Sequence, residues 1–171
     1  MKCVLLITMN TFQSTLSTTV VATGLFLFTL LSPNVTFSES TSSKQKFDVH
    51  VNIDGTDTMM YSKKSFNVRS GQKVKLTFKN IGKLPKVAMG HNIVILKNSV
   101  DLVDFCNEAV KFPTNEYFPK GREKDVIGRT KLLGPGEEDT IYFVAPEQGT
   151  YEYVCTFPGH FALMRGKMIV K

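Results

Sequence analysis

Apolar and polar residues alternate along several short segments of the chain, which is the pattern of half-buried β-strands. Three segments show the alternation, residues 47–53, 74–78 and 140–144, and it is strict in the first. Turn-forming residues follow them, with Asp54-Gly55 after the first segment and Pro146 after the third. Short strands that are separated by turn signals predict an all-β chain, and their spacing favours a β-sandwich.

One segment, residues 100–110, has helical periodicity instead. Its apolar residues at helical spacing are Leu102, Phe105, Cys106 and Ala109. We expect a short helix with Asn98 or Ser99 as its N-terminal cap. Cys106 would lie on the apolar face as a buried, inert thiol, with a redox or intermolecular role as the alternative. The polar segment over residues 112–129 contains prolines and glycines, which predicts an irregular excursion beside the helix.

The first forty residues differ from the rest of the chain. Lys2 is the only charged residue before Glu39, and residues 20–31 form an apolar run. This run is shorter than a membrane span of about 20 residues but suits the core of a signal peptide, roughly 7–15 residues. We therefore expect a signal peptide over residues 1–38, a Ser/Thr-rich spacer over 39–45 and one domain over 46–171. Export would place this domain in the periplasm, and an uncleaved membrane anchor is the alternative for the leader.

The chain is basic, with a formal net charge of +6. Removal of the leader removes Lys2 and leaves 20 basic residues against 15 acidic ones, a net charge of +5. A positive surface favours acidic partners, and such attraction weakens with salt. The basic residues are scattered, with no run long enough for a basic arm, which argues against a nucleic-acid partner.

Metal-binding side chains gather in a short stretch near the C-terminus. Residues 151–155 have strand character, so Cys155 ends a strand, and Pro158-Gly159 supplies a turn before His160. Met164 begins the return to a last strand over residues 167–170. These three side chains can therefore face one point.

A second histidine, His91, lies far upstream, directly before a predicted strand over residues 92–96. Two His and one Cys with a weak, distant Met are the ligand set of a blue-copper electron-transfer site. The Met argues against zinc, which prefers Cys, His and carboxylates. The pattern thus predicts a redox copper protein in which His91 joins the C-terminal stretch through tertiary folding.

The motifs resemble those of the azurins, which are cupredoxins, and the resemblance spans roughly residues 46–171. The stretches that carry it are residues 155–164, Met89-Gly90-His91-Asn92, Leu84-Pro85-Lys86, Thr130 to Gly134 and Asp57-Thr58-Met59. It implies a Greek-key β-sandwich of the cupredoxin type, with one short helix in a flap between strands. It also implies one type 1 copper ion that cycles between Cu(II) and Cu(I) and shuttles single electrons.

The resemblance further implies the geometry of the site. The implied ligands are His91, Cys155 and His160 in a plane, Met164 on one axis and the backbone carbonyl of Gly90 on the other. Asn92 and the amides after Cys155, including that of Phe157, are candidates for hydrogen bonds near the sulfur that tune the reduction potential.

The likeness to azurins also implies an apolar docking patch around the exposed edge of His160. Its members would be Met59, Leu84, Met89, Phe157, Gly159 and Leu163, although Met59, Met89 and Leu163 could be ordinary core. His160 would then pass electrons to redox proteins such as c-type cytochromes or a copper/haem oxidoreductase. Redox encounters usually bury less than about 1,200 Å². We expect a monomer with no small-molecule substrate.

Three positions depart from the azurin pattern. Val49 or a neighbour and Gly71 stand where azurins carry a disulfide, so that bridge is absent. Ile93 stands where they carry a buried Trp, and the chain has no Trp. Asn80 replaces a histidine that titrates with redox state in some azurins. None of these positions is a predicted ligand.

Two other functions fit parts of the pattern. Cys with His can be a nucleophilic pair, but no third orienting group is evident and Met164 would have no role in such an enzyme. We therefore do not expect an enzyme. A copper-binding or copper-delivery protein on the same fold is the stronger alternative, and reversible one-electron cycling without loss of copper would separate the two functions.

Overall fold

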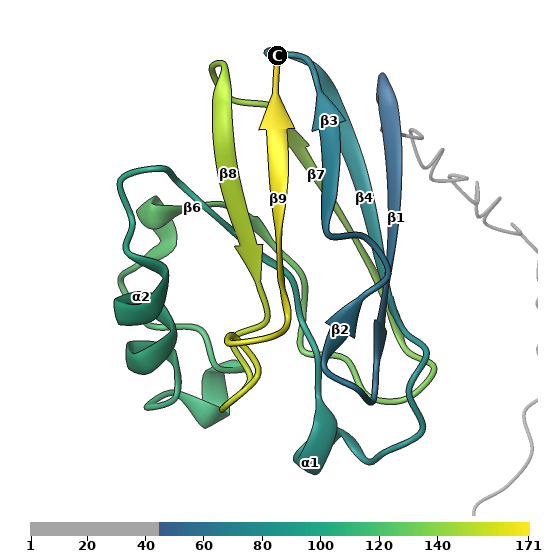
Figure 1. The fold of residues 1–171 in the computed structure, drawn as a ribbon, viewed down its shortest axis with the longest axis vertical. Helices are drawn as coiled ribbons and strands as arrows, with labels where there is room; N and C mark the ends of the chain where they lie inside the picture. The colour runs from purple at the N-terminus through teal and green to yellow at the C-terminus, as the bar shows by residue number, and fades with distance from the viewer. Residues whose placement is uncertain (1–44) are drawn as a thin grey trace, which may run out of the picture. The chain divides into compact units, whose positions relative to one another are not determined.

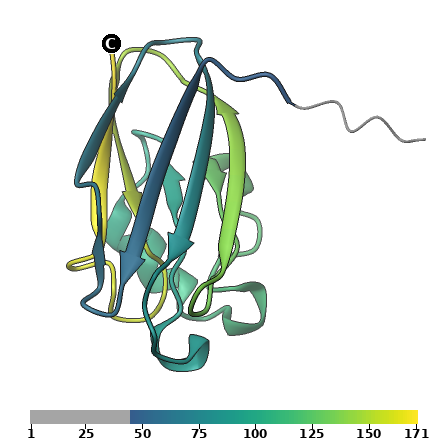
Figure 2. The same ribbon diagram turned by 90° about the vertical axis from the view of Figure 1, so that its right-hand side faces the viewer.

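The computed structural model describes residues 45–171, which form two facing β-sheets whose strands follow one long axis (Figures 1 and 2). The predicted signal peptide lies outside the described residues, as does most of the predicted spacer. The strands are β1 (Val49–Thr56), β2 (Met60–Tyr61), β3 (Ser65–Val68), β4 (Lys73–Asn80), β5 (Val94–Leu96), β6 (Val126–Arg129), β7 (Glu138–Val144), β8 (Gly149–Val154) and β9 (Arg165–Val170). The helices are α1 (Lys86–Met89) and α2 (Leu102–Ala109), with short 3-10 turns η1 (Pro113–Asn115) and η2 (Glu123–Asp125).

The two sheets have the strand orders β2-β1-β4-β7 and β3-β9-β8-β5-β6. Strand β1 pairs in parallel with β4, and β3 pairs in parallel with β9, whereas the other neighbouring strands are antiparallel. Most neighbours in a sheet are distant in the chain, so the chain crosses repeatedly between the sheets. The predicted all-β Greek-key sandwich with a short helix is confirmed.

The alternation of apolar residues places one face of each sheet in a shared core. In β4, Leu76 and Phe78 are completely buried while Lys79 is exposed. They belong to one apolar cluster with Tyr153 and Met168 of the other sheet. Burial of a large apolar side chain contributes roughly 1.5–3 kcal/mol to the stability of the fold. The core therefore stabilises both sheets, and with them the strand ends that carry the site.

Helix α2 covers the outer face of β5 and β8. Its buried Phe105 and Cys106 share an apolar cluster with Val94 and Val154 of those strands. Cys106 is only 1% exposed, as the helical spacing predicts.

The predicted cap of α2 at Asn98 or Ser99 is wrong. The cap is Asp101, whose side chain accepts a hydrogen bond from the Asp104 N–H at 2.8 Å. The chain is still in a turn at Val100, which donates to the Lys97 carbonyl. The helix can therefore begin only after Asp101, an acceptor that suits the N-cap position.

Two further expectations from the sequence need correction. Strand β1 does not turn at Asp54-Gly55 but continues to Thr56, because Gly55 pairs with Tyr61 of β2 and with Asn80 of β4. The excursion over residues 112–129 is not irregular throughout. Its last four residues form β6, which extends the second sheet beside β5.

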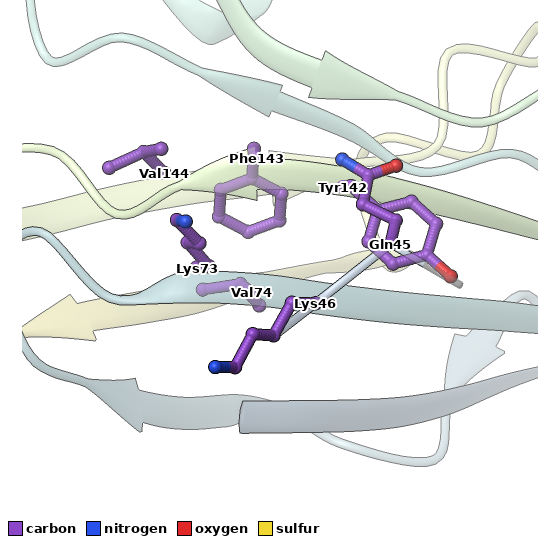
Figure 3. Close-up of a pocket in the computed structure, with 7 residues that line it drawn as sticks. All are labelled: Gln45, Lys46, Lys73, Val74, Tyr142, Phe143 and Val144. Carbon is purple, nitrogen blue, oxygen red and sulfur yellow. The ribbon is translucent and has the colours of Figure 1, made fainter. Parts of the chain in front are cut away.

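The two ends of the sandwich differ in character. Helix α1 and the loops after β1 and β8 gather at the end opposite the C-terminus (Figures 1 and 2). We call it the metal end, for the histidine and cysteine residues on its loops. Lys73 begins β4 and Val144 ends β7 at the other end, where these residues line a shallow hollow beside the first described residues (Figure 3). The residues that line the hollow are Gln45, Lys46, Lys73, Val74, Tyr142, Phe143 and Val144, which include no histidine, cysteine or carboxylate. Within residues 45–171, no helix is long and apolar enough to cross a membrane.

Candidate metal centre

Three side chains from two distant segments meet at the metal end. His91, Cys155 and His160 each offer a ligand atom, and these atoms all lie within 4.8 Å of one another. The Cys155 Sγ is 3.6 Å from the His160 Nδ1, and the two imidazole ring centres are 5.0 Å apart. All three residues are buried. The structure thus brings together the three residues that the sequence singled out as equatorial ligands.

Backbone pairing fixes the two segments beside each other. Val94 of β5 is the partner of Val154 of β8, so the residues just before β5 and just after β8 emerge close together. His91 is further held by two backbone hydrogen bonds with Leu133, at 3.0 and 2.7 Å. The role of Leu133 could not be foreseen from the sequence, because its backbone and not its side chain makes these bonds.

The loop from Cys155 to Met164 is closed by its own backbone. The Cys155 N–H donates to the Met164 carbonyl at 3.0 Å, and this bond continues the pairing of β8 with β9. Inside the loop, the Met164 N–H donates to the His160 carbonyl at 2.8 Å. Gly159 adopts the left-handed conformation with φ of 81°, which glycine reaches without steric cost. The local sequence therefore presents His160 at a fixed place.

A buried amide joins the two ligand segments. The Asn92 Nδ2 donates to the Thr156 Oγ1 at 2.8 Å, and the Thr156 N–H donates to the Asn92 Oδ1 at 2.9 Å. Asn92 therefore links the residue after His91 to the residue after Cys155. Thr156 was not singled out from the sequence, because a threonine after a strand has many ordinary roles.

The surroundings of both histidines favour the neutral imidazole, which is the form that binds a metal ion. Both ring nitrogens of His91 are buried without a hydrogen-bond partner of good geometry. Burial lowers the pKa of His91, although the nearby Thr56 backbone and Asp57 charge oppose this effect. Burial, followed by the charge of His91, lowers the pKa of His160 to about 4. Buried nitrogens without a partner are costly, and a metal ion bound to one nitrogen of His91 would relieve that nitrogen.

The thiol of Cys155 is held protonated by its surroundings. Burial raises the pKa of this thiol to about 12, against smaller effects of hydrogen bonds from the Asn92 and Phe157 backbones that favour the thiolate. A metal cation reverses this balance because it deprotonates a coordinating thiol. The two backbone groups that favour the thiolate, at Asn92 and Phe157, are those that the sequence offers as candidates for hydrogen bonds near the sulfur. Two neutral imidazoles and a thiolate suit copper, so the residues fit the ion.

The two predicted axial donors lie next to this group. Met164 is completely buried at the end of the loop, and its terminal methyl packs against β1, where a Cβ on Gly55 would lie 2.9 Å from it. Gly90 directly precedes His91, and a Cβ there would lie only 2.7 Å from the Lys86 carbonyl. A residue with a Cβ would clash at Gly55 and at Gly90 with the atoms packed there. The sequence alone does not reveal this constraint for either glycine.

The predicted apolar patch is only partly a surface. Leu84 and Leu163 are 45% and 57% exposed, Gly159 is exposed, and Met59 and Met89 are half-buried. Phe157 is the exception, because it is buried and its ring packs 4.6 Å from that of His160. His160 itself is only 3% exposed. The edge of the His160 ring, which the sequence predicts to be exposed, is therefore almost inaccessible to solvent.

Val87 of α1, which the sequence does not single out, is 89% exposed beside this surface. A valine shortly after Leu84-Pro85-Lys86 was the available signal for it. Asn80, which departs from the azurin pattern, is completely buried and donates to the Leu133 carbonyl at 3.1 Å. It therefore supports the backbone that holds His91.

A two-sheet sandwich with a buried Cys-His-His group at one end defines a cupredoxin. The model of the copper-binding proteins of the plastocyanin/azurin family matches residues 47–171, and the chain belongs to this family. It is 36% identical to azurin of Alcaligenes faecalis, over 68% of this chain and 93% of that protein. It is 37% identical to azurin-1 of Alcaligenes xylosoxydans xylosoxydans, over 68% of this chain and 92% of that protein.

Solved structures agree with these relatives. Reduced auracyanin from Roseiflexus castenholzii superposes with a TM-score of 0.66 at 36% identity, over 74% of this chain and 99% of that chain. Azurin iso-2 from Methylomonas sp. strain J gives 0.64 at 31% identity, over 72% of this chain and 98% of that chain. The chain is thus a blue copper electron-transfer protein with a site for one copper ion, and its partners are redox proteins.

Proposed function

We propose that this chain is a one-electron carrier and not an enzyme. The proposed equatorial ligands are the imidazoles of His91 and His160 and the thiolate of Cys155. Met164 and the Gly90 carbonyl are the proposed weak axial donors. Two observations on His91 support this assignment most strongly. Neither of its buried ring nitrogens has a hydrogen-bond partner, and its ligand atom lies within 4.8 Å of those of Cys155 and His160.

When bound, copper supplies the one-electron Cu(II)/Cu(I) couple. The chain contributes a rigid and dry setting for it. The Asn92–Thr156 pair and the closed loop hold the side chains in one arrangement, so little has to move when the charge of the site changes. All three proposed equatorial side chains are buried, which limits the access of a substrate and favours a carrier over an enzyme.

Electrons would pass through His160, since it lies one residue after the exposed Gly159 and beside Leu163. We propose c-type cytochromes or a copper/haem oxidoreductase as partners, in small and short-lived encounters. The leader predicted over residues 1–38 would place these encounters in the periplasm, with residues 39–45 as a spacer and 46–171 as the carrier.

Spectroscopy and electrochemistry of the copper-loaded protein test this function. A carrier should show an intense blue band, a narrow copper hyperfine pattern and reversible one-electron cycling in the presence of a Cu(I) chelator. A copper-delivery protein would instead lose its copper to the chelator upon reduction. A colourless Cu(II) protein would contradict the proposed thiolate ligand.

A further inference from the structure

One side of the metal end is positively charged. Lys63, Lys64 and Arg165, which we call the basic edge, lie next to Leu163. The Lys64 Nζ donates to the Leu163 carbonyl at 3.3 Å, and Arg165 follows Met164 directly. All three residues are exposed, and none of the ion pairs among residues 45–171 includes them.

Backbone contacts fix the positions of these charges. The Tyr153 hydroxyl donates to the Lys63 carbonyl at 2.7 Å, and the Lys167 N–H donates to the Lys64 carbonyl at 3.0 Å. Tyr153 is completely buried in the sandwich core, so it anchors the segment firmly. The backbone that carries Lys63 and Lys64 is therefore held in place at the loop end, and the Lys64 side chain is held there as well by its bond to Leu163.

Nearby carboxylates do not neutralise the basic edge. Asp54 is the acidic residue of β1, and its cross-strand neighbour on β4 is Lys79. Glu152 of β8 stands opposite Lys167 of β9. Each carboxylate thus stands opposite a lysine outside the basic edge, and neither forms an ion pair with the basic edge, whose charge stays uncompensated.

The opposite side of the metal end, around Leu84, is balanced. Lys86 forms an ion pair with Glu137 at 3.3 Å. The Asp57 carboxylate accepts hydrogen bonds from the backbone N–H groups of Lys83 and Leu84 and so lies beside the Lys83 charge. Positive charges have negative neighbours there. The excess positive charge of the metal end therefore lies on the Leu163 side.

We propose that the basic edge binds an acidic surface on the redox partner and turns that partner toward Leu163. The inference rests on the proposed function, because it takes the apolar surface beside His160 as the place where electrons pass. A charged rim beside an apolar contact steers encounter and fixes orientation more than it adds affinity. The occupant is thus a redox protein with carboxylates around its own electron-transfer surface.

Electron exchange with two forms of one haem protein tests this inference. The probes are cytochrome c with its native basic surface and the same protein with its lysines succinylated, which makes its surface acidic. At low ionic strength, Lys63→Glu/Lys64→Glu should slow exchange with the succinylated form about tenfold, within the range of electrostatic steering. It should also flatten the salt dependence of this rate.

The matched control is Arg69→Glu/Lys171→Glu, which makes the same change in net charge at the other end of the sandwich. It should slow exchange with the succinylated probe by less than about twofold, since screened charges act weakly beyond about 10 Å. Lys63→Gln/Lys64→Gln provides a milder change if the glutamate variant does not fold, and should slow exchange in the same direction.

Equal slowing by the edge variant and the control would overturn the inference, because net charge alone would then explain the rates. A parent rate that is no faster with the succinylated probe than with the native one would overturn it as well. In both cases, a parent protein that remains blue and cycles reversibly would leave the proposed function intact. Loss of the blue band or of cycling in the parent protein would instead refute the proposed function.

Discussion

Asn92 and Thr156 exchange two hydrogen bonds across the metal centre, from the Asn92 Nδ2 to the Thr156 hydroxyl and from the Thr156 N–H back to the Asn92 Oδ1. The two residues are 64 positions apart in the chain, and each follows a proposed ligand. Their pairing therefore ties the His91 segment to the Cys155 loop without help from the metal.

Replacement of Asn92 by alanine should loosen this link. Asn92→Ala leaves the buried Thr156 N–H without a partner, which should cost about 1–3 kcal/mol of the free energy of unfolding. Chemical denaturation of the copper-free protein measures this loss. Asn67→Ala, at an exposed position of β3, is the control and should change stability little. An unchanged midpoint for Asn92→Ala would show that water replaces the amide.

Replacement of Cys155 by serine should abolish the blue colour and leave a folded domain. The colour requires the thiolate, whereas the apolar core of the two sheets does not depend on this side chain alone. Visible absorption and circular dichroism check the two parts separately. An intensely blue Cys155→Ser protein would exclude Cys155 as the ligand.

Replacement of Met164 by leucine should keep the blue site and raise its reduction potential. The three proposed equatorial ligands remain, and loss of a weak axial donor favours Cu(I), which tolerates lower coordination. Cyclic voltammetry measures the change. If the potential of Met164→Leu equals that of the parent, Met164 is a packing residue and not a ligand.

Removal of copper should lower the melting temperature, because an ion that binds only the folded state stabilises it. At a free copper concentration of 100 times the dissociation constant, the gain is about 2.7 kcal/mol. This corresponds to a shift on the order of 10 °C for a domain of this size. Calorimetry with and without copper tests the shift, and Cys155→Ser should show much less of it.

Cys106 should resist thiol reagents in the folded protein. It lies on the buried face of α2 and is 1% exposed, and burial raises the pKa of its thiol to about 12, so the reactive thiolate is scarce at neutral pH. The folded, copper-loaded domain should therefore react slowly, and the unfolded domain should react at Cys106 and Cys155. Rapid labelling of Cys106 in the folded protein would indicate that α2 opens.

The sequence predicted the sandwich and the ligand group because both leave local patterns. Alternation of apolar and polar residues marked β1, β4 and β7. The ligand group was predictable because Pro158-Gly159 indicates a turn between Cys155 and His160, and this turn lets Cys155, His160 and Met164 face one point. Strand β6 escaped notice because its four residues are all half-buried and show no alternation. The cap at Asp101 and the burial of Phe157 depend on tertiary contacts, which no local pattern encodes.

The hydrogen bond from the Cys155 N–H to the Met164 carbonyl continues the β8–β9 ladder, so the sandwich ends at these two residues. The eight residues between them form a loop on the frame of the two sheets, and its main side-chain link to the rest of the chain is that of Thr156 to Asn92. Insertions, deletions or a transplanted loop of another length could therefore alter reactivity and partner choice while the frame stays the same. Diversification of such a carrier requires changes in one short stretch and not a new architecture.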